Sequence, residues 1–337
     1  MSVLTDLGWD EHVEGLLGGD PAATPGRVVR VDIDSCQVAT ADGETRARSR
    51  TPIAVGDWVR IQRDDVSTVL EVAPRRSQVA RRDPTGLTQI LAANVDVVLV
   101  AAPADRLSLA RVEREVAIGW DSGARPVVVL TKADLDADGA LARQLRERLV
   151  DVDVISMSSM TGDGADDVRR LLQPARTGVL LGPSGAGKST LTNLLAGREV
   201  AATGEVREGD HRGRHVTSAR EVHVLPSGGV LIDTPGLRSL SLAEDHGGIA
   251  AAFPEIEELS ARCRFRDCAH DREPGCAVTA AVESGALDAD RLANYRKLRR
   301  ETDFQLRRDD PVASHEARMV WKHRAQEARR LFKERGH

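Results

Sequence analysis

The run Gly182-Pro183-Ser184-Gly185-Ala186-Gly187-Lys188-Ser189 has the residue types and spacing of a phosphate-binding loop. It follows an apolar segment at 178–181 and opens a predicted helix that continues through Thr190. The glycines allow backbone N–H groups to surround a β-phosphate at a helix N-terminus, where the helix dipole also favours an anion. Lys188 would reach the β- and γ-phosphate oxygens, and the Ser189 hydroxyl would hold Mg²⁺. We therefore predict a nucleoside triphosphate site built on residues 182–190.

A second polar run, Asp233-Thr234-Pro235-Gly236, ends the apolar segment Val230–Ile232. A carboxylate at the end of a strand can bind Mg²⁺ through water, so Asp233 is a candidate magnesium ligand. The N–H of Gly236 is a candidate contact to a γ-phosphate. Alone, this tetrapeptide is an ordinary turn. About 45 residues after a phosphate loop, it is predicted to be the second switch of a GTPase.

The run Thr131-Lys132-Ala133-Asp134 ends another apolar segment and predicts guanine recognition. A buried Asp134 carboxylate would accept hydrogen bonds from guanine N1–H and its 2-amino group, whereas adenine offers neither donor. The Lys132 stem would lie on the face of the base. After the next strand, backbone N–H groups at Ser158 and Ser159 would reach guanine O6. The usual motif begins with Asn, so Thr131 predicts weaker bracing of this loop.

The order of these motifs along the chain carries further information. Ordinary GTPases have the phosphate loop first, then the switches, then the guanine motif. Here the guanine motif at 131–134 precedes the phosphate loop at 182–189, and the second switch at 233–236 comes last. A circular permutation preserves strand contacts, so the same site can form. The second switch then leads directly into the C-terminal region. We therefore expect loss of the γ-phosphate to affect the placement of that region.

The C-terminal region contains the cluster Cys263-x4-Cys268-x-His270-x5-Cys276. Three sulfurs and one imidazole within 14 residues suit tetrahedral Zn²⁺ in a closed structural site. In a reducing compartment such cysteines bind metal rather than forming disulfides. Cys36 lies far away along the chain and is expected to be a small core residue.

The elements that must position these residues fall into three groups. Residues 27–92 contain about five short strands separated by turns, which fits a small barrel of the oligonucleotide-binding type, although an SH3-like barrel would look similar. Residues 93–240 alternate apolar strands with helical segments, which predicts a doubly wound α/β P-loop domain. Residues 241–337 combine the Cys/His cluster with helical, charge-rich sequence. Residues 1–26 form an acidic leader without an assignment.

The composition limits the classes of protein that fit. With 337 residues, 41% hydrophobic and 29% charged, the chain can bury the cores of several domains. No apolar stretch is long enough to cross a membrane, and the acidic N-terminus lacks the basic start of a secretory signal, so we expect a cytoplasmic protein without a membrane partner. We also expect a monomer. Residues 291–337 hold 14 Lys or Arg against 7 Asp or Glu, which fits a nucleic-acid partner or a solvated helix face.

Taken together, these residues resemble the ribosome small-subunit-dependent GTPase A family. The resemblance covers nearly the whole chain from about residue 27 and extends to segments 54–59, 91–96, 213–218 and 263–278. It implies an oligonucleotide-binding barrel, a circularly permuted GTPase domain and a C-terminal zinc domain. It also implies a protein that binds the small ribosomal subunit late in maturation, with GTP hydrolysis stimulated by ribosomal RNA.

Two departures from the family pattern bear on catalysis. The first switch usually reads His-Thr-Thr-Thr, whereas residues 215–218 read His-Val-Thr-Ser, so Thr217 keeps the predicted Mg²⁺ and γ-phosphate contact. Leu237 stands where many GTPases carry a water-orienting Gln, so hydrolysis should be slow without help. His215 is the candidate for orienting the water, although an exposed loop residue or an RNA contact fits it equally well. The predicted catalytic set is Lys188, His215, Thr217 and Gly236.

The barrel, the basic segment 74–82 and the basic tail would supply phosphate contacts to RNA. Aromatic residues form only 3% of the chain, which favours recognition of folded RNA by shape and backbone over base stacking. The alternative function is a GTP-dependent regulatory or metal-handling protein whose Cys/His cluster passes its metal on. A nucleotide-binding scaffold without turnover is opposed by Lys188, Ser189 and Asp233.

Overall fold

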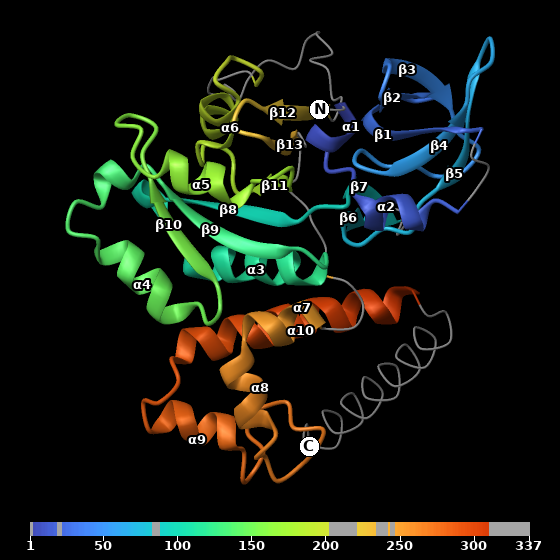
Figure 1. The fold of residues 1–337 in the computed structure, drawn as a ribbon. Coiled ribbons are helices and arrows are strands. Elements are labelled where there is room, and N and C mark those ends of the chain that lie inside the picture. The colour runs from blue at the N-terminus through green and yellow to red at the C-terminus, as the bar shows by residue number, and fades with distance from the viewer. Residues whose placement is uncertain are drawn as a thin grey trace, which may run out of the picture.

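A computed structural model describes residues 3–18, 22–82, 88–201, 221–233, 242 and 247–309 of the chain. Within these ranges an N-terminal barrel, a central α/β sheet and a C-terminal group of helices follow one another (Figure 1). The barrel strands are β1 (Thr24–Val31), β2 (Cys36–Thr40), β3 (Gly43–Arg48), β4 (Trp58–Gln62) and β5 (Ser67–Val72). A separate hairpin, β6 (Gln78–Arg82) and β7 (Thr88–Ala93), leads to the central sheet.

The barrel closes in the order β1-β2-β3-β5-β4 and back to β1. Strands β3 and β5 pair in parallel, and the other barrel pairs are antiparallel. This Greek-key order is that of the oligonucleotide-binding barrel, which confirms the predicted fold and decides against the SH3-like alternative. Cys36 lies in the barrel core, where burial raises the pKa of its thiol to about 11. Its prediction as a small core residue is therefore confirmed.

The central sheet has the order β10-β9-β8-β11-β13-β12, with all strands parallel except β12. This arrangement confirms the predicted doubly wound domain. Its elements are β8 (Val97–Pro103), α3 (Leu109–Asp121), β9 (Arg125–Thr131), α4 (Ala140–Arg148), β10 (Asp153–Met157), α5 (Ala165–Leu171), β11 (Thr177–Leu181), α6 (Lys188–Ala196), β12 (Glu221–Leu225) and β13 (Gly229–Asp233).

Helices cover both faces of this sheet, because its strands are apolar on both sides (Figure 1). Side chains alternate along a strand, so Val98 and Val100 share one core with α3, whereas Val97 and Leu99 share another with α5 and α6. Strand β12 also pairs with β1 of the barrel, at Arg30 and Glu221, so the barrel and the α/β domain form one continuous sheet.

The acidic leader is folded within its described part. It forms α1 (Val3–Asp6) and α2 (Glu11–Leu16), and its apolar residues are buried against Trp58 of the barrel. Trp9 meets the Trp58 ring edge-on at 5.3 Å between centroids. Because β1 begins at Thr24, the predicted boundary between residues 26 and 27 falls inside a strand.

Arg27 joins the leader, the barrel and the α/β domain. Its guanidinium is fully buried and donates hydrogen bonds to the carbonyl O atoms of Leu7 and Gly56 and to Thr177 Oγ1. Burial is the main reason why its pKa is lowered to about 10. This residue therefore fixes the relative placement of three segments that are distant along the chain.

The C-terminal helices are α7 (Gly247–Ala252), α8 (Pro254–Ser260), α9 (Ala277–Glu283) and α10 (Ala289–Asp309), and no strand occurs among residues 247–309. Helices α7 and α10 lie beside α3 (Figure 1). One hydrophobic cluster includes Val112 and Val116 of α3 together with Phe253 and Tyr295. The C-terminal region thus shares its core with the α/β domain. None of the helices in the described ranges is long and apolar enough to cross a membrane.

Candidate nucleotide and metal sites

The candidate nucleotide site lies at the carboxyl ends of two neighbouring strands, β8 and β11. After β8 the chain continues to β9 and β10 on one side of the pair. After β11 it continues to β12 and β13 on the other side. Open α/β sheets bind ligands in the crevice outside such a pair. The loop after β11 is the predicted phosphate loop, and the loop after β8 is a 3₁₀ turn, η1 (Ala104–Arg106).

The phosphate loop has the backbone that its glycines predict. Gly187 precedes α6 in the left-handed region, with φ +84°. Gly182 has φ +142°, and a Cβ atom there would lie 2.7 Å from the carbonyl O of Ala101. Both positions require glycine. The loop therefore ends directly at the first turn of α6, as binding of a phosphate at a helix N-terminus requires.

Lys188 begins α6 and folds back over the loop. Its Nζ donates hydrogen bonds to the carbonyl O atoms of Gly182 and Pro183, each at 2.8 Å. Ser189 and Thr190 follow in the first helical turn. The ammonium group and the Ser189 hydroxyl consequently lie at the same end of the helix as the loop.

Thr131 connects the guanine motif with the phosphate loop. Its side chain is buried at the end of β9, and Oγ1 donates to the carbonyl O of Ala186 at 2.8 Å. Thr131 therefore braces the loop through its hydroxyl, in place of the amide that an Asn would supply. Since the C=O and N–H of one peptide point in opposite directions, this bond also turns the N–H of Gly187 away from Thr131.

Asp134 lies on the second 3₁₀ turn, η2 (Ala133–Leu135), and contacts the loop after β10. Its carboxylate accepts a hydrogen bond from Ser158 Oγ at 2.6 Å. Ser158 is buried, and its Oγ accepts the N–H of Met160 at 3.2 Å. The two base-recognition loops therefore meet as predicted. The prediction of a buried Asp134 is wrong, because this residue lies on a surface turn and is exposed, as is Ser159.

Lys132 ties the two 3₁₀ turns together. Its backbone is left-handed, with φ +56°, and its Nζ lies 2.7 Å from Asp105 Oδ2 on η1. The hydrogen bond from Lys132 is the main reason why the pKa of Asp105 is lowered. The loops after β8 and β9 are thereby held side by side at the crevice.

Asp233 and Ser189 are the described candidates for a magnesium site. Asp233 ends β13 and is half-buried, and burial raises its pKa against the opposing influence of His223 and Lys188. Hard oxygen atoms of this kind are what Mg²⁺ prefers, so the donor set fits the ion. The remaining predicted residues, His215, Thr217, Gly236 and Leu237, lie outside the described residues, as does the tail beyond residue 309.

Two further residues, Arg106 and Glu115, lie beside the phosphate loop without any signal in the sequence. They line a cavity of about 290 Å³ that also touches Pro183. Glu115 Oε2 is buried without a hydrogen-bond partner among the described residues, and burial raises the pKa of this carboxyl to about 7. Neither residue belongs to a motif, so only the fold brings them to the site.

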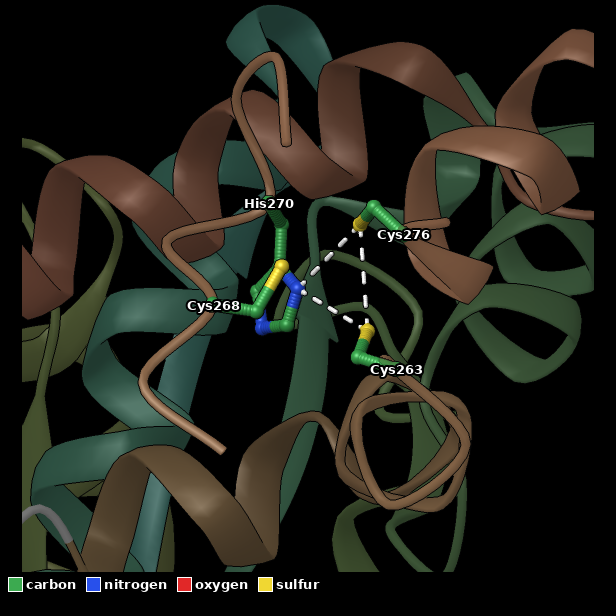
Figure 2. Close-up of side chains that lie close together, drawn as sticks. All are labelled: Cys263, Cys268, His270 and Cys276. Carbon is green, nitrogen blue, oxygen red and sulfur yellow. Dashed lines mark hydrogen bonds between the residues drawn. The ribbon is translucent and has the colours of Figure 1, made fainter. Parts of the chain in front are cut away.

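The four residues of the Cys/His cluster come together as predicted (Figure 2). Their ligand atoms all lie within 4.8 Å of one another. His270 Nδ1 is 3.6 Å from Cys263 Sγ and 3.5 Å from Cys276 Sγ, and these two sulfurs are 3.8 Å apart. With metal–sulfur bonds of about 2.3 Å, a tetrahedral ion separates its ligands by about this much. The cluster could therefore hold a metal ion.

The surroundings of the cluster orient its ligands. Ser260 Oγ donates to the carbonyl O of Ile256 at 2.7 Å and lies 3.0 Å from His270 Nε2. The imidazole must therefore donate from Nε2, which leaves Nδ1 unprotonated and able to bind a metal. Burial opposes ionisation of Cys276, but hydrogen bonds with Thr279, His270 and Cys268 together outweigh it and lower its pKa to about 6. The site is thus prepared for a cation.

In the basic segment 74–82, which is predicted to contact RNA, two arginines pair with carboxylates of the protein itself. Arg75 makes a paired hydrogen bond to both carboxylate oxygens of buried Asp57, each at 2.7 Å. Arg76 lies 3.8 Å from Asp96. Arg75 is therefore a structural residue of the barrel, which the sequence did not reveal because Asp57 lies in a turn motif far from it along the chain.

Comparisons with known proteins agree with this architecture. The family profile for RsgA GTPase matches residues 72–243, about half of the chain. The small ribosomal subunit biogenesis GTPase RsgA of Streptomyces coelicolor is 43% identical over 96% of this chain and 93% of its own length. The protein of the same name from Opitutus terrae is 41% identical over 95% of each chain.

Two solved structures share the fold. YjeQ from Thermotoga maritima has a TM-score of 0.61 and 23% identity, over 82% of this chain and 96% of its own. YloQ, described as a circularly permuted GTPase, has a TM-score of 0.59 and 24% identity, over 87% and 98%. The profile covers about half of the chain, and the relatives are 41–43% identical over nearly its whole length, so the chain belongs to the RsgA GTPase family.

Proposed function

We propose that this GTPase acts in biogenesis of the small ribosomal subunit, binds its ribosomal RNA and hydrolyses GTP faster when bound to it. The main support for GTP binding is the hydrogen bond between Thr131 Oγ1 and the Ala186 carbonyl O. It joins the loop that would select guanine to the loop that would hold the phosphates. The names of the relatives support the ribosomal part.

In this proposal Lys188 neutralises charge that develops on the phosphates, and Asp134 selects guanine through N1–H and the 2-amino group. Ser189, Thr217 and Asp233 would hold Mg²⁺, which supplies further positive charge at the γ-phosphate. Gly236 N–H contacts the γ-phosphate, and His215 orients the attacking water. Ser158 holds the Asp134 carboxylate in place, with Ser159 beside the base.

The Cys/His cluster is proposed to bind one structural Zn²⁺ through Cys263, Cys268, His270 and Cys276. The chemistry of the donor set supports zinc, since three sulfurs and one imidazole suit a closed tetrahedral site. A closed set leaves no open position for ligand exchange. This geometry argues against the metal-handling alternative.

RNA contacts are assigned to the barrel (27–92) and to the basic end of the C-terminal region (241–337), on either side of the GTPase domain (93–240). The protein is proposed to act as a cytoplasmic monomer. Because the second switch leads into the C-terminal region, the nucleotide state should alter affinity for the subunit.

Equilibrium sedimentation with purified small subunits tests this proposal. At one fixed salt concentration, affinity should be about 1–3 kcal/mol higher with a non-hydrolysable GTP analogue than with GDP. Large subunits serve as the control. Equal affinity in both nucleotide states would show that the nucleotide does not control ribosome binding.

A further inference from the structure

We infer that Arg106 is a positioning residue of the nucleotide site, which holds the Ser184–Gly185 peptide so that its N–H faces the phosphates. Arg106 Nη2 donates to the carbonyl O of Ser184 at 2.7 Å. It also lies against Gly185, where an added Cβ atom would collide with Nη2. The inference rests on the proposed nucleotide-binding function.

Peptide geometry converts this contact into an effect on the ligand. The C=O of Ser184 and the N–H of Gly185 belong to one planar peptide and point in opposite directions. Gly185 has φ +72°, in a region that glycine enters and leaves at little cost, so the loop sequence alone does not fix this peptide. A side chain that binds the carbonyl on the outside holds the N–H toward the inside of the loop.

The turn that carries Arg106 is itself held in place. It follows β8, on the other side of the crevice from the phosphate loop. Its neighbour Asp105 is bound by Lys132 of the guanine motif at 2.7 Å. Among the described residues Arg106 forms no ion pair, and its guanidinium binds the Ser184 carbonyl O instead. The arrangement links base recognition to the phosphate loop through one short turn.

Arg106 is exposed, so its removal should alter the site rather than the stability of the fold. The variants to compare are Arg106→Ala, Arg106→Lys and, as the matched control, Arg111→Ala. Arg111 lines the same cavity from α3 and is also exposed, but no described contact joins it to the phosphate loop. Each variant is measured as the full chain.

The readouts are the dissociation constants of GTP, GDP and GMP and the ³¹P NMR shift of the β-phosphate of bound GDP. Arg106→Ala should weaken GTP and GDP about tenfold, change the β-phosphate shift and leave GMP competition unchanged, because GMP has no β-phosphate. Arg106→Lys keeps one cationic donor and should recover part of the loss. The dissociation constants of GTP and GDP for Arg111→Ala should lie within about twofold of the wild-type values, because no described contact joins Arg111 to the phosphate loop.

Two results would overturn the inference. One is an Arg106→Ala variant that binds GTP and GDP as tightly as Arg111→Ala, with the same β-phosphate shift. The other is an equal loss for GMP, which would place the effect in the base site or the fold. A wild-type chain that binds no guanine nucleotide would instead overturn the proposed function itself.

Discussion

Asp134 is the residue on which guanine selection depends. Its exposed carboxylate accepts a hydrogen bond from Ser158 and has further acceptor capacity for a base. Asp134→Asn replaces an acceptor of two protons by an amide with one acceptor atom. GTP affinity should fall by about 2–3 kcal/mol. Isothermal titration with GTP measures this loss.

The control for Asp134→Asn is xanthosine triphosphate, which carries a carbonyl where guanine has its 2-amino group. The amide N–H can donate to that carbonyl, so the variant should bind this nucleotide more tightly than the wild type does. Equal affinity of the wild type for ATP and GTP would contradict the assignment.

Glu115 predicts a pH dependence of stability. Because burial raises its pKa from 4.5 to about 7, the folded chain holds a proton that the unfolded chain releases. The contribution of this group to stability is fully present below about pH 4.5 and is lost as the pH rises to about 7. Arg111, Lys188 and Arg114 oppose the shift.

Glu115→Gln keeps the shape of the side chain and removes the charge. It should raise the free energy of unfolding by about 1–3 kcal/mol near pH 8 and by much less near pH 5. Urea denaturation at both pH values measures the difference. Glu147→Gln, at an exposed position on α4, is the control. A gain that is equal at both pH values would contradict the account.

At the scale of elements, apolar runs predicted the parallel strands well. The run 126–130 became β9 (Arg125–Thr131), and Gly178–Leu181 became β11, because strands buried on both faces leave an uninterrupted apolar signal. Strand β12 was missed. Its sequence, Glu-Val-His-Val-Leu, mixes polar and apolar residues, and its place is set by antiparallel pairing with β13, which no local pattern reveals.

The Cys/His cluster predicts a metal-dependent C-terminal element. The purified chain should contain about one Zn²⁺, and Cys268→Ser should lose it and unfold α8 and α9 first. Nucleotide affinity should change little, since the cluster is separate from the phosphate loop in the fold (Figure 1). Elemental analysis and hydrogen exchange measure the two effects.

Cys36→Ser is the matched control for this variant, because Cys36 lies in the barrel core and should keep the metal content unchanged. Full folding of the C-terminal helices after complete metal removal would contradict a structural role for the ion.

At the scale of the whole molecule, the C-terminal region and the α/β domain form one body around buried charges. Glu113 of α3 is buried and accepts hydrogen bonds from Arg148 at 2.5 Å and from Arg291 at 3.0 Å. Arg291 also binds Glu255 and stacks over Phe253 at 4.5 Å. The sequence predicts a C-terminal domain at 241–337 but not these contacts with α3, because pairs more than 100 residues apart leave no trace in composition or periodicity.

Arg291→Met should therefore destabilise the protein by about 3 kcal/mol, since buried Glu113 keeps Arg148 but loses Arg291, and half-buried Glu255 loses its ion pair with Arg291. Urea unfolding followed by circular dichroism measures the change. Arg296→Met on the same helix removes only a pair with exposed Asp271 at 3.6 Å and should cost at most about 1 kcal/mol. An early, separate unfolding phase of α7–α10 in the wild type would show that the two regions are independent.

We propose that this chain hydrolyses GTP in response to the small ribosomal subunit. Single-turnover hydrolysis, measured with the full chain alone, with small subunits and with large subunits, tests it most directly. Leu237 cannot orient a water molecule, so the chain alone should be slow, and small subunits should raise the rate at least about tenfold. Large subunits should have no effect. A rate that is the same in all three conditions, with GTP fully bound, would contradict the account.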